Sequence, residues 1–370
     1  MLYFCVNNNY DVMLDKKLIE NIDEETCLIQ VPFYLDTNDI DGFSTVIKFN
    51  NSDMLSFSRF LFHFKKILSV KEEIIEKLKI TSNDILFIHT DTVLINNIII
   101  EHFYSNKCKI YLLEDGVATM TDYNISSLKL NFIDRLRIFL FSKMYNTPNL
   151  GMVNIGVEKQ LRINDNLFNG LIVTFGDKTL RKIPVYKVKL NYEKVNIEYH
   201  KGAIFLNQNF YPYYFNEEEF IDFLKEILII SARYQPFYFK FHQNDSVTMR
   251  NKIIFMIKKE YPDVSIIEEN IPAEKIIKTY PVKYSITFFS TASINHLRYG
   301  LIPIFLVDLI LQKKYFTELN IFKMFLDNIN CKYPKMIEEI NSNYNSLSCF
   351  EVDAKAISFK TIFDEIINKG

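Results

Sequence analysis

The chain has 370 residues, a formal net charge of −2 and a hydrophobic content of 48%. This length predicts two domains of ordinary globular composition, and the near-zero net charge gives no general attraction to nucleic acid. The N-terminus has no basic segment followed by a long apolar one, and apolar runs such as Leu301–Val307 are too short to span a membrane, so we expect a cytoplasmic protein.

The sequence lacks the motifs of several common structural and binding sites. The five cysteines include no CxxC pair, which suits a reducing compartment and argues against a disulfide framework or a zinc site. Only nine glycines occur, and neither GxGxxG nor GxxxxGK[ST] is present, so a standard dinucleotide enzyme or a P-loop NTPase is not expected. The cysteines are Cys5, Cys27, Cys108, Cys331 and Cys349.

Short apolar runs alternate with helical patterns through the first half of the chain. A strand over Leu2–Val6 leads into a helix from about Tyr10, and apolar side chains spaced between Phe60 and Leu78 predict a second helix. Alternating strands and helices indicate βαβ units and a mainly parallel sheet. The predicted strands are Leu2–Val6, Cys27–Val31, Val46–Phe49, Asp84–His89 and Lys109–Leu113.

A second series of the same kind follows in the second half. Its first strand is Ile204–Leu206, and Asn216 with Glu219 three residues later forms a capping box that opens a helix through about Arg233. The alternation again predicts a mainly parallel sheet. The later predicted strands are Phe237–Phe241, Val264–Ile267, Ile286–Phe289 and Ile302–Val307.

The border between the two series lies in a lysine-rich stretch, Asp177–Lys201, that contains Pro184. This composition predicts an edge strand or a linker. We therefore place the boundary near residue 195 and expect two α/β domains, residues 1–195 and 196–370.

The first candidate site lies at the end of the last strand of the first series. Glu114, Asp115 and Gly116 follow the buried run Lys109–Leu113. A carboxylate at the carboxyl end of a parallel strand faces the region where α/β domains bind ligands, and glycine allows a sharp turn behind it. The same residues are also typical of an ordinary strand-ending turn.

The second candidate site lies at the end of the strand Phe237–Phe241. Lys240 and His242 alternate with aromatic residues and therefore point to one face of the strand end. A cation and an imidazole on one face suit a phosphate group. A strand that simply emerges into solvent also explains this pattern.

The third candidate site is the start of a helix over Ile294–Arg298. Ser290 and Thr291 precede this helix at the end of a strand. The free N–H groups and the dipole of a helix N-terminus favour an anion, and the hydroxyl groups add donors. Helix capping alone is the other explanation.

The order and spacing of these three groups resemble the bacterial sialyltransferases, specifically the group of lipooligosaccharide sialyltransferases and capsular polysialyltransferases. That group has a D/E-D/E-G motif in its first domain, a K-x-H-P motif in its second and a later S-S/T pair. Glu114–Gly116, Lys240–His242 and Ser290–Thr291 match in that order. Ile271–Glu274 is similar to the family segment whose acid contacts the cytidine ribose. Gln243 departs from the pattern, because the family has a proline there.

The resemblance implies a GT-B fold, in which two Rossmann-like domains with mainly parallel sheets face a central cleft. The first domain would bind the acceptor and the second the CMP-sugar. The implied reaction is the inverting transfer of sialic acid from CMP-sialic acid to a hydroxyl of a bacterial surface glycan, lipooligosaccharide or capsule, without a metal ion or other cofactor. Asp115 would be the general base, supported by Glu114, with Gly116 at the substrate-binding turn behind it.

The resemblance also implies how the second domain would bind the donor. His242 would donate a hydrogen bond to the phosphate of CMP, and Lys240 would assist electrostatically. The remaining phosphate oxygens would be bound by Ser290 and Thr291. Glu274 would accept hydrogen bonds from both ribose hydroxyls.

A DxD pair, Asp39 and Asp41, competes with the metal-independent interpretation. In other glycosyltransferases such a pair holds Mn²⁺ or Mg²⁺ on a nucleotide diphosphate. Here it lies in the turn-rich segment Asp36–Gly42, and we interpret it as a turn.

A basic amphipathic pattern covers Leu128–Tyr145, with Arg135 and Arg137 among apolar residues. It predicts either a helix that covers the sheet with a solvated basic edge or a peripheral contact. The partner in the second case would be anionic lipid at the inner face of the cell membrane or a negatively charged acceptor.

Two other functions remain open at this stage. A GT-B transferase that uses another nucleotide sugar, such as CMP-Kdo, would share the fold and most of the motifs. A GT-B scaffold that binds glycan without turnover is compatible with Gln243 in place of proline. The oligomeric state is not specified by the sequence.

Overall fold

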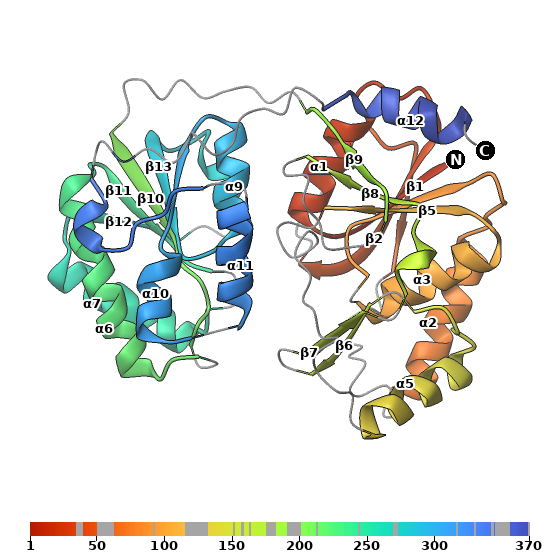
Figure 1. The fold of residues 1–370 in the computed structure, drawn as a ribbon, viewed down its shortest axis with the longest axis horizontal. Helices are drawn as coiled ribbons and strands as arrows, with labels where there is room; N and C mark the ends of the chain where they lie inside the picture. The colour runs from red at the N-terminus through yellow and green to blue at the C-terminus, as the bar shows by residue number, and fades with distance from the viewer. Residues whose placement is uncertain are drawn as a thin grey trace. The chain divides into compact units, whose positions relative to one another are not determined.

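The chain divides into two compact units, shown as a ribbon in Figure 1. Met1–Asn191 and Asp353–Gly370 form the first unit, and Tyr192–Val352 forms the second. The computed structural model describes residues 1–34, 40–49, 63–91, 93–114, 132–150, 152–156, 159–162, 164–174, 183–190, 201–211, 214–242, 245–268, 273–315, 317–328, 331–341, 344 and 356–368.

A seven-stranded sheet forms the centre of the first unit, in the order β3-β2-β1-β4-β5-β8-β9. Every neighbouring pair in it is parallel, so the carboxyl ends of all seven strands lie at one edge. The strands are β1 Leu2–Asn8, β2 Thr26–Tyr34, β3 Thr45–Lys48, β4 Ile85–Ile88, β5 Lys109–Leu113, β8 Gly170–Val173 and β9 Val185–Lys187. A separate antiparallel hairpin joins β6 Met152–Gly156 and β7 Lys159–Arg162.

The five strands predicted in the first half all occur, with ends within a few residues of those expected. The central residues of β1, β2, β4 and β5 are buried on both faces of the sheet, which explains why these strands form continuous apolar runs, whereas the edge strand β3 is only partly buried. β9 is the edge strand predicted within Asp177–Lys201. The helices of this unit are α1 Asn9–Ile19, α2 Phe64–Lys77, α3 Leu94–Ser105, α5 Phe132–Tyr145 and α12 Phe359–Asn368, with a 3₁₀ turn at Asp165–Leu167.

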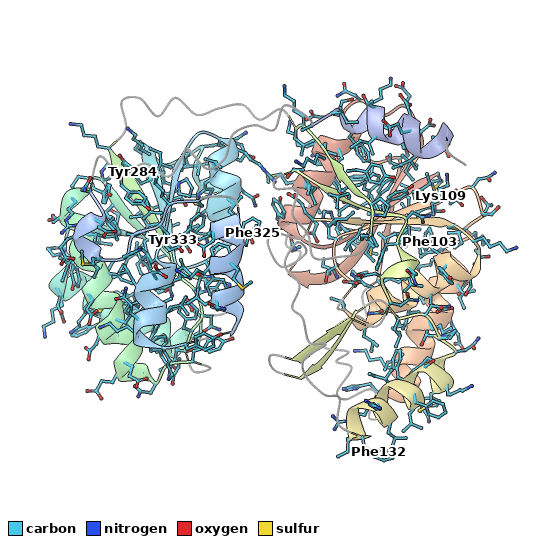
Figure 2. All side chains as sticks on the ribbon, in the orientation of Figure 1. Phe103, Lys109, Phe132, Tyr284, Phe325 and Tyr333 are labelled. Carbon is cyan, nitrogen blue, oxygen red and sulfur yellow. The ribbon has the colours of Figure 1, made fainter. Side chains whose placement is uncertain are left out.

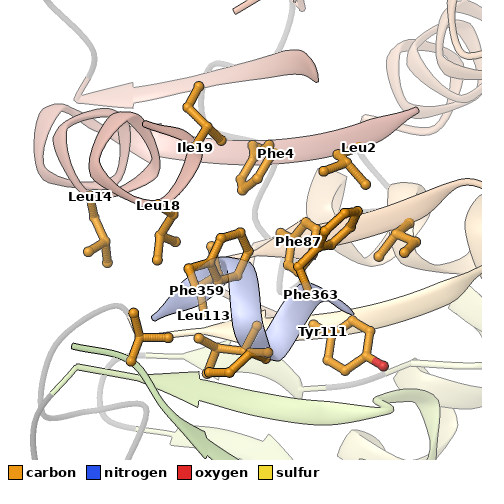
Figure 3. Close-up of a cluster of buried hydrophobic side chains, with 14 of the residues drawn as sticks. Leu2, Phe4, Leu14, Leu18, Ile19, Phe87, Tyr111, Leu113, Phe359 and Phe363 are labelled. Atoms are coloured by element: carbon orange, nitrogen blue, oxygen red, sulfur yellow. The ribbon is translucent and has the colours of Figure 1, made fainter. Parts of the chain in front are cut away.

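The last helix of the chain, α12, packs on the first unit and not on the second. Its Phe359 lies against Phe87 of β4, with ring centroids 5.6 Å apart, and Phe363 is buried in the same cluster (Figure 3). Lys109 of β5 also donates to the carbonyl of Ile366 at 2.7 Å. The structure therefore places residues 353–370 in the first unit, whereas the sequence analysis placed all of 196–370 in the second domain.

A five-stranded parallel sheet forms the centre of the second unit, in the order β12-β11-β10-β13-β14. The predicted capping box of Asn216 and Glu219 is present and opens α6. The strands are β10 Gly202–Leu206, β11 Phe237–Lys240, β12 Val264–Ile267, β13 Val282–Thr287 and β14 Ile302–Phe305. The helices are α6 Glu217–Leu228, α7 Val247–Glu260, α8 Ala273–Ile276, α9 Thr291–Arg298, α10 Val307–Lys313 and α11 Thr317–Asn328, with 3₁₀ turns at Ile229–Arg233 and Ile337–Glu339.

One strand of the second unit lies earlier in the chain than predicted. β13 ends at Thr287, whereas the sequence analysis placed this strand at Ile286–Phe289. Phe288 and Phe289 belong to the turn before α9, where they contact the ring of Phe210. Their apolar character therefore serves a packed turn, which cannot be distinguished from a strand end by hydrophobicity alone.

Candidate functional site

Glu114 leaves β5 as a buried carboxylate with several donors around it. The hydroxyl of Tyr10 donates to its Oε1 at 3.1 Å, and the backbone N–H of Thr174 donates to its Oε2 at 2.6 Å. The hydroxyl of Thr174 also donates to Oε1. These bonds join the ends of β5 and β8, so Glu114 fixes the chain just before Asp115. Asp115 and Gly116 themselves lie outside the described residues.

His89, at the end of β4, holds the other side of the same chain segment. Its Nδ1 donates to the carbonyl of Glu114 and its Nε2 donates to Oδ1 of Asp15, both at 2.9 Å. Oδ1 of Asp11 lies 3.7 Å from Nδ1. Because both ring nitrogens face oxygen acceptors, the ring is a doubly protonated imidazolium.

The charge on His89 is balanced by two buried carboxylates of α1. Burial opposes the charged ring, but Asp11, Asp15 and the carbonyl of Glu114 outweigh it and raise the pKa of His89 to about 10. Burial also raises the pKa of Asp15 to about 6 and raises that of Asp11, although His89 acts in the opposite direction on both. None of these three residues is among the site residues predicted from the sequence.

His242, two residues after the end of β11, has a backbone held by its neighbours. Its N–H donates to Oδ2 of Asp245 at 2.9 Å, and its carbonyl accepts from the N–H of Asp245 at 3.1 Å and from Nη2 of Arg250 at 2.9 Å. Asn207, at the end of β10, donates to the same Oδ2 of Asp245 at 2.9 Å. These bonds restrain the backbone of His242, directly before the position where the resemblance leads us to expect a proline; Gln243 lies outside the described residues.

The environment of His242 favours its neutral form. Burial lowers the pKa of His242, and the nearby charges of Lys240 and Arg250 lower it further, while Asp245 acts in the opposite direction. Burial raises the pKa of the Asp245 carboxyl, which Asn207 and the backbone of His242 partly offset by hydrogen bonding. A neutral imidazole still carries one N–H donor. Lys240 is half-buried on the same strand end.

Ser290 is the N-cap of α9. Its hydroxyl oxygen accepts from the N–H of Ala292 at 3.2 Å, so the capping explanation holds for this residue. The turn before it is fixed by Gln208, whose Oε1 accepts from the N–H of Phe289 at 2.7 Å. Thr291 is the first residue of the helix.

A buried hydrogen-bonded chain connects α9 with the start of α8. The hydroxyls of Ser285 and Ser293 lie 2.8 Å apart, and Ser285 also bonds Nδ1 of His296 at 2.8 Å. Nε2 of His296 donates to the carbonyl of Ala273, again at 2.8 Å. Burial lowers the pKa of His296 to about 4, so the ring is neutral. Its Nε2 donates one hydrogen bond and its Nδ1 accepts one. Glu274 follows Ala273 in α8; its side chain lies outside the described structure.

The second sheet brings two of the predicted groups to one edge. Lys240 of β11 and Thr287 of β13 are both register partners of Leu206 in the central strand β10. Because all three strands are parallel, the segment through His242 and the segment through Ser290 leave the sheet at the same edge, on either side of β10.

Neither a metal cluster nor a membrane-spanning helix occurs in the described part of the chain. No group of three or more His, Cys, Asp or Glu side chains among those residues is arranged to hold a metal ion. No helix there is both long and apolar enough to cross a bilayer. Of the DxD pair, Asp41 lies in a turn beside Gly42, which has a positive φ of 100°, and Asp39 lies outside the described residues.

Comparison with known proteins identifies the family. A sequence model of the alpha-2,8-polysialyltransferases (POLYST) matches residues 11–307. The chain belongs to the alpha-2,8-polysialyltransferase family. The matched span contains every site residue predicted from the sequence. No curated protein sequence matches this polysialyltransferase-family chain.

Solved structures show that this family member has the GT-B fold. UDP-GlcNAc 2-epimerase of Methanocaldococcus jannaschii, solved with UDP-GlcNAc and UDP, superposes with a TM-score of 0.58 at 11% identity and covers 100% of both chains. TcCGT1 in complex with UDP gives 0.53 at 11% identity, covering 100% of this chain and 98% of the other. The spinosyn forosaminyltransferase SpnP gives 0.52 at 9% identity, covering 100% and 99%. Family and fold together make the chain a glycosyltransferase.

Proposed function

We propose that this glycosyltransferase transfers sialic acid from CMP-sialic acid, with inversion, to a hydroxyl of a bacterial surface glycan, lipooligosaccharide or capsule. The observation that carries the proposal is the shared sheet edge of the second unit. On one side of β10, strand β11 brings Lys240 and His242 to that edge. On the other side, β13 leads to Ser290 at the N-terminus of α9. A cation, an imidazole N–H and a helix N-terminus are all suited to the phosphate of a CMP-sugar.

The donor would be bound mainly by groups that carry hydrogen-bond donors. Neutral His242 donates an N–H to a phosphate oxygen, and Lys240 adds positive charge. Ser290 and Thr291 bind the remaining oxygens at the start of α9. Glu274 accepts from the ribose hydroxyls, and His296 supports it by holding the carbonyl of Ala273, the residue before it.

The acceptor would be activated by Asp115. As general base it removes the proton from the attacking hydroxyl, and the bond from the anomeric carbon to the CMP phosphate breaks as the new glycosidic bond forms. Glu114 and His89 act as positioning residues, because they fix the chain immediately before Asp115 from two directions. Gly116 supplies the turn behind the base. CMP leaves as a phosphate monoester, so the proposal assigns no metal ion or other cofactor.

The cytoplasm is the compartment that we propose for this reaction. Cys5, Cys27, Cys108 and Cys331 are buried free thiols, which suits a reducing environment.

Donor choice is tested by thermal shift with a panel of nucleotides. CMP should stabilise the chain, by about 2.7 kcal/mol at a concentration 100-fold above its Kd, while UMP, UDP, GMP and AMP should not. His242→Ala should abolish the CMP shift without changing the melting temperature of the free chain by more than a few degrees. A thermal shift with UDP but not with CMP would indicate that the donor is a UDP-sugar. Stabilisation by CMP-Kdo but not by CMP-sialic acid would select the other CMP-sugar.

Catalysis is tested separately with Asp115→Asn. This variant should bind CMP as the wild type does and lose at least about 100-fold in transfer rate, the lower end for a positioned base. Transfer at the wild-type rate would exclude Asp115 as the base. Binding of glycan without turnover in the wild type would indicate a scaffold.

A further inference from the structure

Helix α5 lies at one end of the first unit (Figure 1), and several of its large apolar side chains are exposed to solvent. Phe132 is 78% exposed, Ile133 58%, Phe139 55% and Leu136 42%. The side chain of Phe132 points away from the unit in Figure 2. Four large apolar side chains exposed on one helix are more than the isolated exposed apolar residues that soluble proteins commonly carry.

The opposite side of the same helix is anchored in the fold. Phe141 and Tyr145 are buried, with ring centroids 4.8 Å apart, and Tyr145 lies 5.7 Å from the ring of Phe64 at the start of α2. Lys71 of α2 donates to the carbonyl of Tyr145. The exposed face is therefore the outer face of a docked helix and has no part in the core.

Positive charge accompanies the apolar side chains. Lys143 is exposed in helical register with Phe132, Leu136 and Phe139, and its ammonium lies 6.0 Å from the centroid of the Phe139 ring. Arg135 is exposed beside them. The helix contains three basic residues and one acid, within a chain whose net charge is −2.

We propose that this face of α5, defined by Phe132, Ile133, Leu136, Phe139, Arg135 and Lys143, docks on the surface of an anionic lipid bilayer. A helix that lies in the membrane interface has apolar side chains that enter the boundary of the acyl chains. Its cations lie at the level of the headgroups. A soluble polyanionic glycan would pair with the cations but leave the apolar side chains in water. A second copy of the chain would bring like charges together across a two-fold contact.

Vesicle flotation tests this docking without any donor or acceptor. The full chain is mixed either with phosphatidylcholine vesicles or with vesicles that contain about one-third phosphatidylglycerol, a fraction that gives a strongly negative surface. The wild type should float with the anionic vesicles and not with the neutral ones. Phe132→Ser/Phe139→Ser should abolish flotation. Arg135→Gln/Lys143→Gln should weaken the partition coefficient roughly 30-fold, from about 1 kcal/mol per basic residue near an anionic surface.

Matched controls use exposed residues of α7 in the second unit. Phe255 is 70% exposed, and Lys258 and Lys259 are exposed. Phe255→Ser and Lys258→Gln/Lys259→Gln should float as the wild type does. All variants should keep the wild-type melting temperature, since none of these side chains is buried.

Three results would overturn the docking proposal. The first is a wild type that does not float with anionic vesicles, and the second is α5 variants that float as well as the controls. The third is dimerisation in sedimentation velocity that Phe132→Ser/Phe139→Ser abolishes, which would assign the face to a second copy. The proposed sugar transfer is unaffected by these outcomes, because a soluble acceptor measures it without vesicles.

Discussion

Replacing His89 by glutamine removes a buried positive charge from between Asp11 and Asp15, and the expected loss of stability depends on pH. In the folded chain the pKa of His89 is about 10, against the ordinary value of 6.5. Because the folded value is higher, the stabilisation is complete below pH 6.5 and is lost as the pH rises towards 10. Its full size is on the order of 5 kcal/mol, at about 1.4 kcal/mol for each unit of pKa.

Urea titrations followed by circular dichroism measure this effect, because the chain has no tryptophan. The difference in unfolding free energy between wild type and His89→Gln should shrink by about 3 kcal/mol between about pH 7 and about pH 10. In the wild type the pKa of Asp15, about 6, lies below this pH range. At neutral pH, adding Asp15→Asn to His89→Gln should recover part of the loss, because one unbalanced buried charge is removed.

His102→Gln is the matched control. Its ring donates to the carbonyl of Leu78 at 2.9 Å and forms no ion pair with any described residue. The unfolding free energy of this variant should differ from that of the wild type by the same amount at both pH values. A difference for His89→Gln that is equally independent of pH would refute the assignment of an imidazolium at His89.

The remaining predictions concern the hydrogen bonds and packing around the two sheet edges. Asp245→Ala should weaken CMP binding at least about tenfold, as measured by calorimetry. The backbone of His242 loses an acceptor that restrains it, and a charged hydrogen bond contributes about 1.5 kcal/mol or more. Unchanged affinity for CMP would contradict this. Glu114→Gln should lower the unfolding free energy by about 1–3 kcal/mol, because an amide has fewer acceptor sites for the buried donors of Thr174. Phe363→Ala should cost about 3–5 kcal/mol in a urea titration if α12 belongs to the core of the first unit, whereas an unchanged transition midpoint would argue against that packing.

Most strands could be predicted because parallel sheets bury both faces and leave continuous apolar runs in the sequence. The first helix of the second unit was predicted from a local signal, the capping box of Asn216 and Glu219. The position of α12 could not be predicted in this way. Its amphipathic pattern indicates a helix but does not show which of the two domains the helix packs against. The ring that Phe359 contacts, Phe87, lies far away in the chain.

The site shows the same division between local and distant contacts. The bond from His242 to Asp245 spans three residues, and an Asp shortly after a strand end is a local turn signal that was not used in the sequence analysis. The donors to Glu114 come from Tyr10 and Thr174, at separations of 104 and 60 residues, which no local pattern reveals. The pairing of His89 with α1 depends in the same way on the order of strands in the sheet.

The most direct measurement of the central claim is the release of CMP from CMP-sialic acid, with EDTA present, in the presence and absence of a glycan acceptor. The proposed function predicts release that depends on a sialic-acid-terminated or galactose-terminated acceptor, equals the amount of sialylated product and disappears in Asp115→Asn. A chain that binds these acceptors but releases no CMP, or that transfers sugar only from another nucleotide donor, would contradict it.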